Sequence, residues 1–274
     1  MRRTGQRAVA LGGEHVEGHH AVRELLVASR RRVEEIVVVD TAKRSPEIAE
    51  IISLARSRKV PVRPIPPQAF RALATSSVPQ GVVARAEPLV SVRLDDLVNT
   101  NSRSFERIVP FLVVLSEVTD PHNLGAILRS ALGAGATGVV MGRRRSAPLS
   151  ASAVKAAAGA VEHLPIALVA SIAEALRHLS KIGLWTVGLD PKGESSVLDL
   201  EVADRPIALV AGAEGRGLPA LVARRCDLLC RIPLYGPVES LNVSVAVALA
   251  AFSVASRRGI REYRTSTPDG PSSS

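Results

Sequence analysis

The sequence contains few aromatic and few sulfur-bearing residues. Aromatic residues make up only 3% of the 274 residues, and there are two cysteines and two methionines. Two cysteines form neither a disulfide framework nor a four-ligand zinc site, so Cys226 and Cys230 are expected to be reduced, partly buried thiols. So few rings disfavour a protein that binds unpaired bases mainly by stacking. Hydrophobic residues still make up 46%, which predicts a folded core of Ala, Val, Leu and Ile.

Long apolar runs and an excess of acidic residues are also absent. No stretch is long enough to span a membrane, and the arginine-rich N-terminus lacks the apolar segment of a signal peptide, so a cytoplasmic protein is expected. There are 35 Lys and Arg residues against 26 Asp and Glu, a net charge of +9. Residues 1–107 alone carry 18 basic and 12 acidic residues. This charge favours a polyanionic partner over a merely solubilising surface.

The hydrophobic pattern divides the chain into two units. Residues 9–88 alternate helical and strand-like stretches, which predicts a small α/β unit. Residues 89–107 are polar and weakly periodic, as in a linker that can include a helical turn. Residues 108–262 form the second unit, and 263–274 are expected to be a disordered tail. In the first unit, the pattern is helical over 16–29 and 46–58 and strand-like over 35–40, 60–64 and 81–86.

The second unit alternates strands and helices more clearly. Phe111–Leu115 is a continuous apolar run, which predicts a strand covered on both faces. The alternation indicates an α/β domain with a parallel, doubly wound sheet. Its last helix, predicted over Leu241–Ser256, is apolar all round, so it is expected to be buried or to pack against a second subunit. The other elements are predicted over 123–134, 138–141, 151–158, 164–169, 172–179, 184–189, 207–211 and 228–233.

Ligands of such sheets bind at the carboxyl ends of the strands, where three unusual segments lie. The first is 117–130, EVTDPHNLGAILRS. Asp120 and Pro121 predict a turn, Asn123 lies at or near a helix N-terminus, and Arg129 follows almost two helical turns later. These two side chains can belong to a ligand site. Equally well, Asn123 can be a helix cap and Arg129 can face solvent.

The second segment is 210–219, VAGAEGRGLP. Its glycines at 212, 215 and 217 permit close backbone approach to a ligand. Their GxxGxG spacing differs from the GxGxxG of dinucleotide sites, and Glu214 among them would repel a phosphate. A ligand with a cationic centre therefore fits this loop better than a nucleotide phosphate.

The third segment is 232–245, IPLYGPVESLNVSV, which leaves a strand through a Gly-Pro loop and enters the last helix. Ser240 is the expected N-cap, and capping alone would explain it, whereas Asn242 in the first turn is unexpected on helix propensity. Elsewhere, Arg143–Arg145 directly follow a strand. They are expected either to clamp RNA phosphates or to form a solvated turn.

Together the three segments resemble, in order, the motifs of the SpoU/TrmH family of RNA 2′-O-ribose methyltransferases, part of the SPOUT superfamily. The matching phrases are DPHNLGAILRSA, GAEGRGL and IPLYGPVESLNVSVAVALA, and residues 145–165 add RSAPLSASAVKAAAGAVEHLP. The match covers about residues 108–258. In the first unit, GHHAVREL and PQGVVARAEP resemble the bacterial branch that methylates guanosine of 23S ribosomal RNA. In that branch the N-terminal unit is an RNA-binding domain similar to ribosomal protein L30e.

The resemblance implies a trefoil-knotted C-terminal methyltransferase domain, a homodimer with active sites built from both subunits, and S-adenosylmethionine as the methyl donor. No metal is required, because the sulfonium already activates the methyl group. The residues implied to be catalytic are Asn123, Arg129, Glu214, Ser240 and Asn242. Those whose surrounding backbone is implied to hold the cofactor are Val187, Gly212, Ile232 and Leu241.

The role of Arg129 has two interpretations. The resemblance allows a general base, but a guanidinium in a protein is effectively always protonated. We therefore favour an electrostatic stabiliser of the developing alkoxide, or a clamp on the adjacent phosphate. Asn123 and Glu214 are expected to orient Arg129 and the substrate.

The RNA that carries the acceptor ribose stays open at this point. Ribosomal RNA of the large subunit is favoured by the N-terminal resemblance, and transfer RNA is the alternative. Methylation that confers resistance to a ribosome-targeting antibiotic is a third reading. A non-catalytic RNA-binding or ribosome-assembly factor is the alternative from another class. It predicts gaps in the motifs, yet all five candidate catalytic residues are present.

Overall fold

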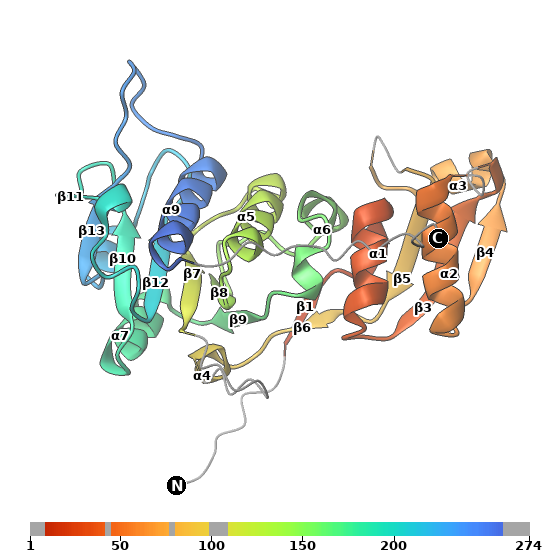
Figure 1. Ribbon diagram of the computed structural model, residues 1–274, viewed down its shortest axis with the longest axis horizontal. Coiled ribbons are helices and arrows are strands. Elements are labelled where there is room, and N and C mark those ends of the chain that lie inside the picture. The colour runs from red at the N-terminus through yellow and green to blue at the C-terminus, as the bar shows by residue number, and fades with distance from the viewer. Residues whose placement is uncertain (1–8, 42–44, 77–79, 99–108, 260–274) are drawn as a thin grey trace, which may run out of the picture.

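The computed structural model describes residues 9–41, 45–76, 80–98 and 109–259. Two α/β units with separate sheets follow one another along the long axis of the molecule (Figure 1). The expected tail, 263–274, and the last part of the expected linker lie outside the described residues. Within the described ranges, none of the helices has the length and apolar character needed to cross a membrane.

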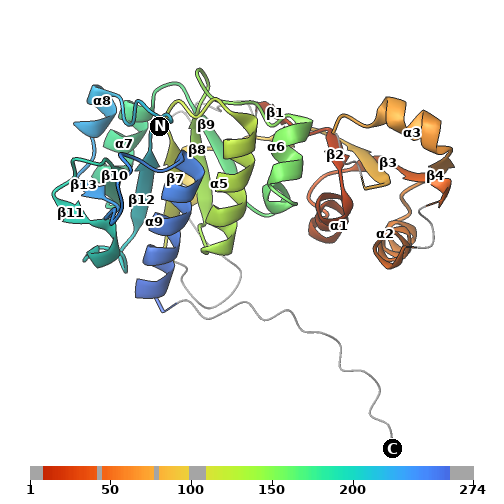
Figure 2. The same cartoon turned by 90° about the horizontal axis from the view of Figure 1, so that it is seen from above.

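The N-terminal unit is built on a four-stranded sheet in the order β2-β5-β3-β4. In β3, Ile36 and Val38 belong to the cluster under α1 and α2, whereas Val37 and Val39 pack with Phe70 of α3 on the other face. This alternation places helices on both faces of the sheet (Figure 2). The elements are β2 (His15–Glu17), α1 (His19–Ala28), β3 (Val33–Val39), α2 (Pro46–Ser57), β4 (Val62–Ile65), α3 (Pro67–Leu73) and β5 (Val82–Ala86).

The helix predicted over 16–29 was wrong at its start. His15–Glu17 pairs antiparallel with β5, and α1 begins only at His19. Gly18 separates the two elements with φ at +100°, a conformation that side-chain-bearing residues avoid. A three-residue strand paired with a distant partner has too little periodicity of its own to be recognised.

The C-terminal unit contains a seven-stranded sheet in the order β11-β13-β10-β12-β7-β8-β9. Every pair of neighbouring strands is parallel, which confirms the predicted α/β architecture. The strands are β7 (Phe111–Leu115), β8 (Gly138–Gly142), β9 (Ile166–Val169), β10 (Trp185–Leu189), β11 (Ser195–Ser196), β12 (Ile207–Ala211) and β13 (Leu228–Arg231).

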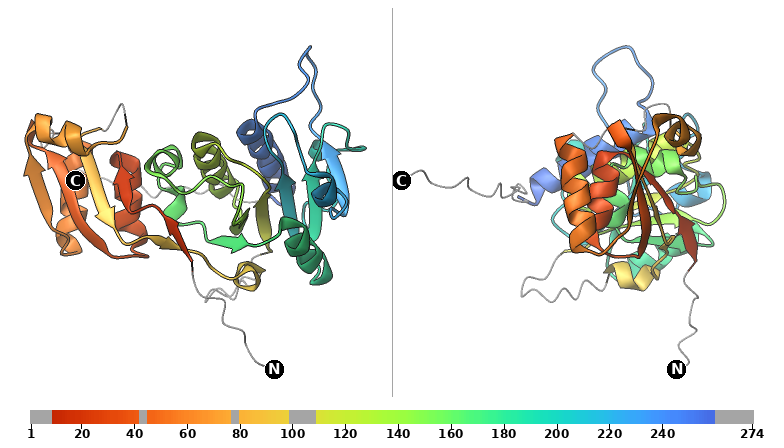
Figure 3. Two further views of the ribbon diagram at one scale, coloured as in Figure 1. Left: turned by 180° about the vertical axis from the view of Figure 1, so that it is seen from behind. Right: turned by 90° about the vertical axis from the view of Figure 1, so that its right-hand side faces the viewer.

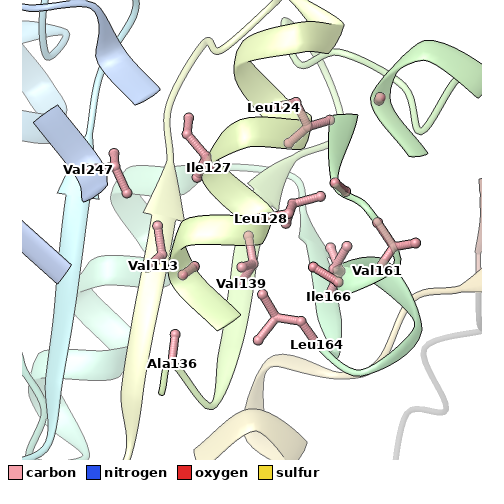
Figure 4. Close-up of a cluster of buried hydrophobic side chains, with 14 of the residues drawn as sticks. Val113, Leu124, Ile127, Leu128, Ala136, Val139, Val161, Leu164, Ile166 and Val247 are labelled. Atoms are coloured by element: carbon pink, nitrogen blue, oxygen red, sulfur yellow. The ribbon is translucent and has the colours of Figure 1, made fainter. Parts of the chain in front are cut away.

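Helices cover both faces of this sheet, as the buried run of β7 requires. Val113 lies under α5 and α9, whereas Leu112 and Val114 face the cluster that contains α7. Figure 4 shows Ile127 and Leu128 of α5 above strands β7 and β8. The helices and 3-10 turns are α4 (Leu94–Val98), α5 (Pro121–Gly133), α6 (Ala151–Ala156), η2 (Ala160–Glu162), α7 (Ile172–Lys181), η3 (Val197–Asp199), α8 (Ala220–Ala223) and α9 (Val243–Arg257).

The described part of the expected linker is packed rather than free. β6 (Leu89–Val90) pairs with β1 (Ala10–Gly12), and the amide of Val92 donates to the carbonyl of Ile166 at 2.9 Å. In α4, Leu97 is buried against Gly138. Residues 89–98 therefore extend along the second sheet.

The two units are joined by a desolvated ion pair. Arg31 follows α1, and its guanidinium contacts the carboxylate of Glu162 in η2 at 2.6 Å, with the two side chains only 5% and 1% exposed. His163 contacts Glu24 of α1 at 2.7 Å. Figure 3 shows α1 beside α6 from behind. Removing one partner would leave an unpaired buried charge, so substitution of Arg31 or Glu162 alone is expected to destabilise this junction.

A second buried carboxylate, Glu17 in β2, gives a stability prediction. It accepts hydrogen bonds from the amide of Thr75 at 2.9 Å and from the Ser76 hydroxyl, and Ser76 accepts one from Lys155 of α6 at 2.6 Å. Burial alone would raise the pKa of Glu17, but the bonds from Ser76 and Thr75 outweigh it, and the pKa is lowered. We expect Glu17→Gln to lower the free energy of unfolding at pH 7 by about 1.5–3 kcal/mol, as for hydrogen bonds to charged groups.

The sign of the pH dependence follows from the lowered pKa. The contribution of Glu17 is fully present above the unfolded-state pKa of about 4.3 and is lost as pH falls through the folded-state pKa. Urea unfolding at pH 7, 5 and 3.5 should therefore show the gap between wild type and Glu17→Gln closing in acid. Glu14→Gln, at an exposed site, is the control. A gap that is constant over this range would contradict the assignment.

Candidate active site

The sheet reverses its direction of growth between β7 and β12. From β7 the chain adds β8 and β9 on one side, then returns to build β10, β12 and β13 on the other. Ligands of open parallel sheets bind at such a point, outside the carboxyl ends of the strands. Asn123 follows β7 and Glu214 follows β12, so these two candidates come from adjacent strand ends.

Three of the candidate side chains form one closed network. The Asn123 amide nitrogen donates to Glu214 Oε2 at 2.9 Å. The Asn242 amide nitrogen donates to Asn123 Oδ1 at 3.0 Å and to Glu214 Oε1 at 3.1 Å. Each side chain therefore bonds the other two. The network joins the N-termini of α5 and α9, whose dipoles favour a negative charge such as Glu214.

Helix capping aligns the members of this network. Asp120 caps α5 by accepting from the amides of His122 and Asn123 at 3.3 and 3.1 Å. Asn242 caps α9 by accepting from the Ser244 amide at 2.8 Å. The N-cap prediction for Ser240 was therefore wrong, because α9 begins at Val243 and Asn242 takes the cap position. The N-cap role also explains why an asparagine stands at position 242, which helix propensity alone did not explain.

A pocket opens beside the network, between the ends of β10, β12 and β13 and the start of α9. Its empty space, counted out to its open mouth, is about 730 Å³. Gly212, Ile232 and Leu241 line it, together with Ser240 and Glu214. Three of the four residues expected to hold a cofactor are thus brought together.

The charged side chains that line the pocket are acidic. Asp190, Glu214 and Glu239 line it, and its lining includes no Lys, Arg or His. Such a pocket attracts a cationic ligand and repels phosphate groups, as the position of Glu214 in the glycine loop predicted. The sequence pattern did not single out Asp190 or Glu239. The available signal for Asp190 was a carboxylate placed directly after a predicted strand.

The glycine loop forms one wall of the pocket by folding back on itself. Ala213 and Gly217 exchange backbone hydrogen bonds at 3.0 and 2.9 Å. Gly215 and Gly217 have φ at +76° and +64°. A Cβ on Gly212 would lie 2.1 Å from the Gly217 carbonyl oxygen. The close approach that requires glycine at 212 is therefore made within the loop.

Val187 does not line the pocket. Its side chain is fully buried, and its strand neighbours on the two sides are Leu209 and Leu228. The pocket instead begins at Leu189 and Asp190, where β10 ends. The part of β10 that lines the pocket is therefore its carboxyl end, two residues beyond Val187.

Arg129 is not part of the network. It lies six residues after Asn123, about 240° around the helix axis, and is exposed. Its guanidinium forms neither a hydrogen bond nor an ion pair with any residue that the structure describes. The expectation that Asn123 and Glu214 orient Arg129 is therefore not met, since both are bonded to each other and to Asn242.

The three consecutive arginines differ in their surroundings. Arg145 bonds Glu117 at 2.8 Å, and both residues have positive φ, at +57° and +62°. Arg143 and Arg144 are exposed and without a partner in the described part of the chain. They follow β8 and lie at the same edge of the sheet as the pocket, so these two of the three are free to bind an anion.

The two cysteines are free thiols. Burial, with a smaller effect from the charge of Asp227, raises the pKa of Cys226 to about 12. Burial also raises the pKa of Cys230, which lines the floor of the pocket at the end of β13. Both groups stay protonated at neutral pH, so neither is a nucleophile.

Comparisons with known proteins match both units. Residues 110–252 match the model of the SpoU rRNA Methylase family, and residues 15–91 match that of RNA 2′-O ribose methyltransferase substrate binding. The 23S rRNA (guanosine-2′-O-)-methyltransferase RlmB of Yersinia pestis is 39% identical over 251 residues, 90% of this chain and 99% of its own. YacO of Bacillus subtilis, placed in the TrmH family of tRNA/rRNA methyltransferases, is 35% identical over 245 residues, 89% of this chain and 96% of its own.

Solved structures are similar over the same length. An AdoMet-bound rRNA methyltransferase from Sinorhizobium meliloti has a TM-score of 0.72 and 26% identity, covering 90% of this chain and 87% of its own. The SpoU methyltransferase AviRb from Streptomyces viridochromogenes, with AdoMet, has a TM-score of 0.72 at 23% identity and shares the fold over 89% of this chain and 90% of its own.

Proposed function

This chain belongs to the SpoU rRNA Methylase family, and we propose that it transfers a methyl group from S-adenosylmethionine to a ribose 2′-hydroxyl of 23S ribosomal RNA. The observation that carries this proposal is the Asn123–Glu214–Asn242 network at the mouth of an acidic, glycine-walled pocket. The match of residues 15–91 to a substrate-binding model supports ribosomal RNA as the substrate, since it extends the likeness beyond the catalytic unit.

The pocket fits the positive charges of S-adenosylmethionine. Asp190 and Glu239 offer carboxylates to its ammonium and sulfonium groups, and the lining holds no cation to oppose them. We infer that the backbone at Gly212, Ile232 and Leu241 holds the adenosyl group. When bound, S-adenosylmethionine supplies an electrophilic methyl group on a positively charged sulfur. The residues of the chain need only align the acceptor and stabilise the charge that develops on its oxygen.

The chain's own side chains then have separate tasks. Asn242, fixed by capping α9, and Asn123 hold Glu214 in one orientation at the pocket mouth. Ser240 lies on the same rim with a hydroxyl free to bond the substrate. Arg129, permanently charged, stabilises the negative charge that develops on the 2′-oxygen as the hydroxyl proton passes to solvent water and the methyl group leaves the sulfur. In a homodimer with active sites built from both subunits, Arg129 would reach the acceptor ribose from the exposed face of α5.

Three further expectations belong to this proposal. Residues 9–88 act as the RNA-binding unit and 108–262 as the methyltransferase unit. The pocket is enclosed by 189–190, 211–217 and 230–246, the segments that a trefoil knot of this family would interlace. A cytoplasmic location follows from the proposed substrate.

The deciding experiment maps 2′-O-methylation in ribosomal and transfer RNA with and without the gene, and repeats methyl transfer with the purified chain and transcripts. Absence of one methylated position in 23S ribosomal RNA, restored in vitro, supports the proposal. A missing position in transfer RNA would change the substrate. A non-catalytic assembly factor predicts no transfer, and no thermal stabilisation by S-adenosylmethionine.

Arg143 and Arg144 give a prediction about RNA affinity. Replacing both by alanine should weaken RNA binding and reduce the slope of log K against log salt by about 0.7–0.9 for each phosphate that is no longer neutralised. Arg145→Ala is the matched control, because Arg145 is already paired with Glu117. Filter binding over a salt series measures the slope. Equal slopes for the double variant and wild type would remove the phosphate role.

The exposed face of α9 gives a prediction about assembly. Val245, Leu249 and Phe252 are 46%, 44% and 52% exposed, while the opposite face packs on the sheet and α5. We infer that this apolar stripe is the homodimer contact. Phe252→Glu would bury an unpaired carboxylate there, so we expect the dimer dissociation constant to rise roughly 100-fold or more.

Sedimentation over a concentration series measures that constant. Ile182→Glu is the control, since Ile182 is 44% exposed but follows α7 on the other side of the sheet. A Phe252→Glu protein that dimerises like wild type would place the interface elsewhere.

A further inference from the structure

Tyr235 is the most exposed aromatic side chain in the described part of the chain. It is 92% exposed, against 52% for Phe252, while Phe70 and Phe111 are buried. It lies in the segment between β13 and α9, which projects from the body of the C-terminal unit (Figure 1). A ring held almost wholly in water, in a protein with only 3% aromatic residues, contributes nothing to the core.

The position of Tyr235 relates it to the pocket. Leu234, its neighbour in sequence, lines the pocket, and so do Glu239 and Ser240 on the returning arm of the same segment. The segment is therefore one wall of the site, and Tyr235 lies on its outer rim. A ribose whose 2′-oxygen reaches the pocket carries its base to this rim.

Charge decides which part of an RNA can approach there. The pocket carboxylates repel the phosphate backbone, whereas the neutral face of a base is not repelled. Arg216, in the facing glycine loop, is exposed and has no partner among the described residues, so it can take a phosphate outside the pocket. Tyr235 and Arg216 belong to the two segments that line one pocket, and an aromatic ring combined with a cation is typical of sites that bind unpaired nucleotides.

We propose that Tyr235 stacks on a base of the substrate RNA, at or next to the nucleotide that is methylated. This inference rests on the proposed function and makes Tyr235 a substrate-positioning residue. A second copy of the chain is the other candidate for contact. The apolar stripe of Val245, Leu249 and Phe252 already offers such a copy a continuous face, and it runs along α9 on residues that do not line the pocket.

Four variants of the full chain test the proposal, with 23S ribosomal RNA transcript as the probe. Tyr235→Ala and Tyr235→Leu remove the ring, and Tyr235→Phe and Tyr235→Trp keep it. The first two should raise the Kd and KM for RNA by roughly 5- to 150-fold, the equivalent of about 1–3 kcal/mol for one stacked base. Tyr235→Phe and Tyr235→Trp should keep the Kd and KM for RNA near the wild-type values. Affinity for S-adenosylmethionine and the oligomeric state should not change in any variant.

A direct readout uses an oligonucleotide of the mapped site with 2-aminopurine at the target or at a neighbouring position. Wild-type protein should quench its fluorescence through stacking, and Tyr235→Leu should not. Equal RNA affinity and equal quenching for the two proteins would overturn the proposal. Dissociation of the dimer in the Tyr235 variants would also overturn it, because Tyr235 would then contact the partner subunit. A loss of affinity for S-adenosylmethionine in these variants would overturn it as well. Quenching needs no methyl transfer, so an inactive wild-type enzyme would defeat the proposed function while stacking is decided separately.

Discussion

Gly212→Ala is expected to weaken the binding of S-adenosylmethionine severely. The new Cβ would lie 2.1 Å from the Gly217 carbonyl oxygen and 2.5 Å from the Leu218 nitrogen, both backbone atoms. No side-chain rotation relieves such contacts, so the loop must open and break the Ala213–Gly217 pair. Overpacking costs about 1–3 kcal/mol where neighbours can yield, and a backbone cannot, so we expect at least a ~100-fold loss of affinity. Titration calorimetry measures it.

Two other glycines separate this effect from a general loss of structure. Gly236 has open space around it and lies in the neighbouring segment, so Gly236→Ala should bind the cofactor normally. Gly215 also has open space around it, but its φ is +76°. Gly215→Ala should therefore lower the free energy of unfolding by about 1–2 kcal/mol through backbone strain alone. Normal binding by Gly212→Ala would show that the folded-back loop is not the cofactor wall.

Arg129→Ala is expected to lower kcat by about 100- to 1,000-fold, the usual effect of removing one donor that stabilises a developing oxyanion. Cofactor affinity should be unchanged, because Arg129 does not line the pocket. Thermal stability should also be unchanged, because the side chain is exposed and unpaired within the described residues. Single-turnover methyl transfer at saturating RNA measures the effect.

Arg129→Lys distinguishes charge from shape. Lysine keeps the positive charge but loses the planar fork, so partial recovery is expected. Arg177→Ala removes an exposed arginine from α7, on the other face of the sheet, and should leave kcat at the wild-type value. A near-normal kcat for Arg129→Ala would refute the catalytic assignment outright.

The order of strands and helices was readable from the sequence because each element carries its own pattern. Phe111–Leu115 is apolar at every position, and it is a central strand buried on both faces. The strand β2 was missed because only its pairing with β5 makes it a strand. The choice between Ser240 and Asn242 as N-cap failed for a similar reason. Both are good caps, and only the bonds of Asn242 to distant residues decide between them.

The resemblance named Asn123, Glu214 and Asn242 as residues of one site, and the structure brings them together, but their geometry was not predictable. Asn123 and Asn242 stand 119 positions apart and bond each other directly, a contact for which no local signal exists. The resemblance names the backbone around Val187, whereas the pocket lining begins at Leu189, and no motif shows which residue of a strand is the last before the edge. The resemblance also names Arg129, but its six-residue spacing from Asn123 turns it about 240° around the helix axis.

The buried Arg31–Glu162 pair has a consequence for substrate choice. Arg31 and Glu162 join the two units through a buried ion pair. If residues 9–88 bind RNA as proposed, this junction sets the distance between the RNA-binding unit and the pocket. We expect such a protein to select an RNA by the spacing between two of its folded parts as well as by its bases.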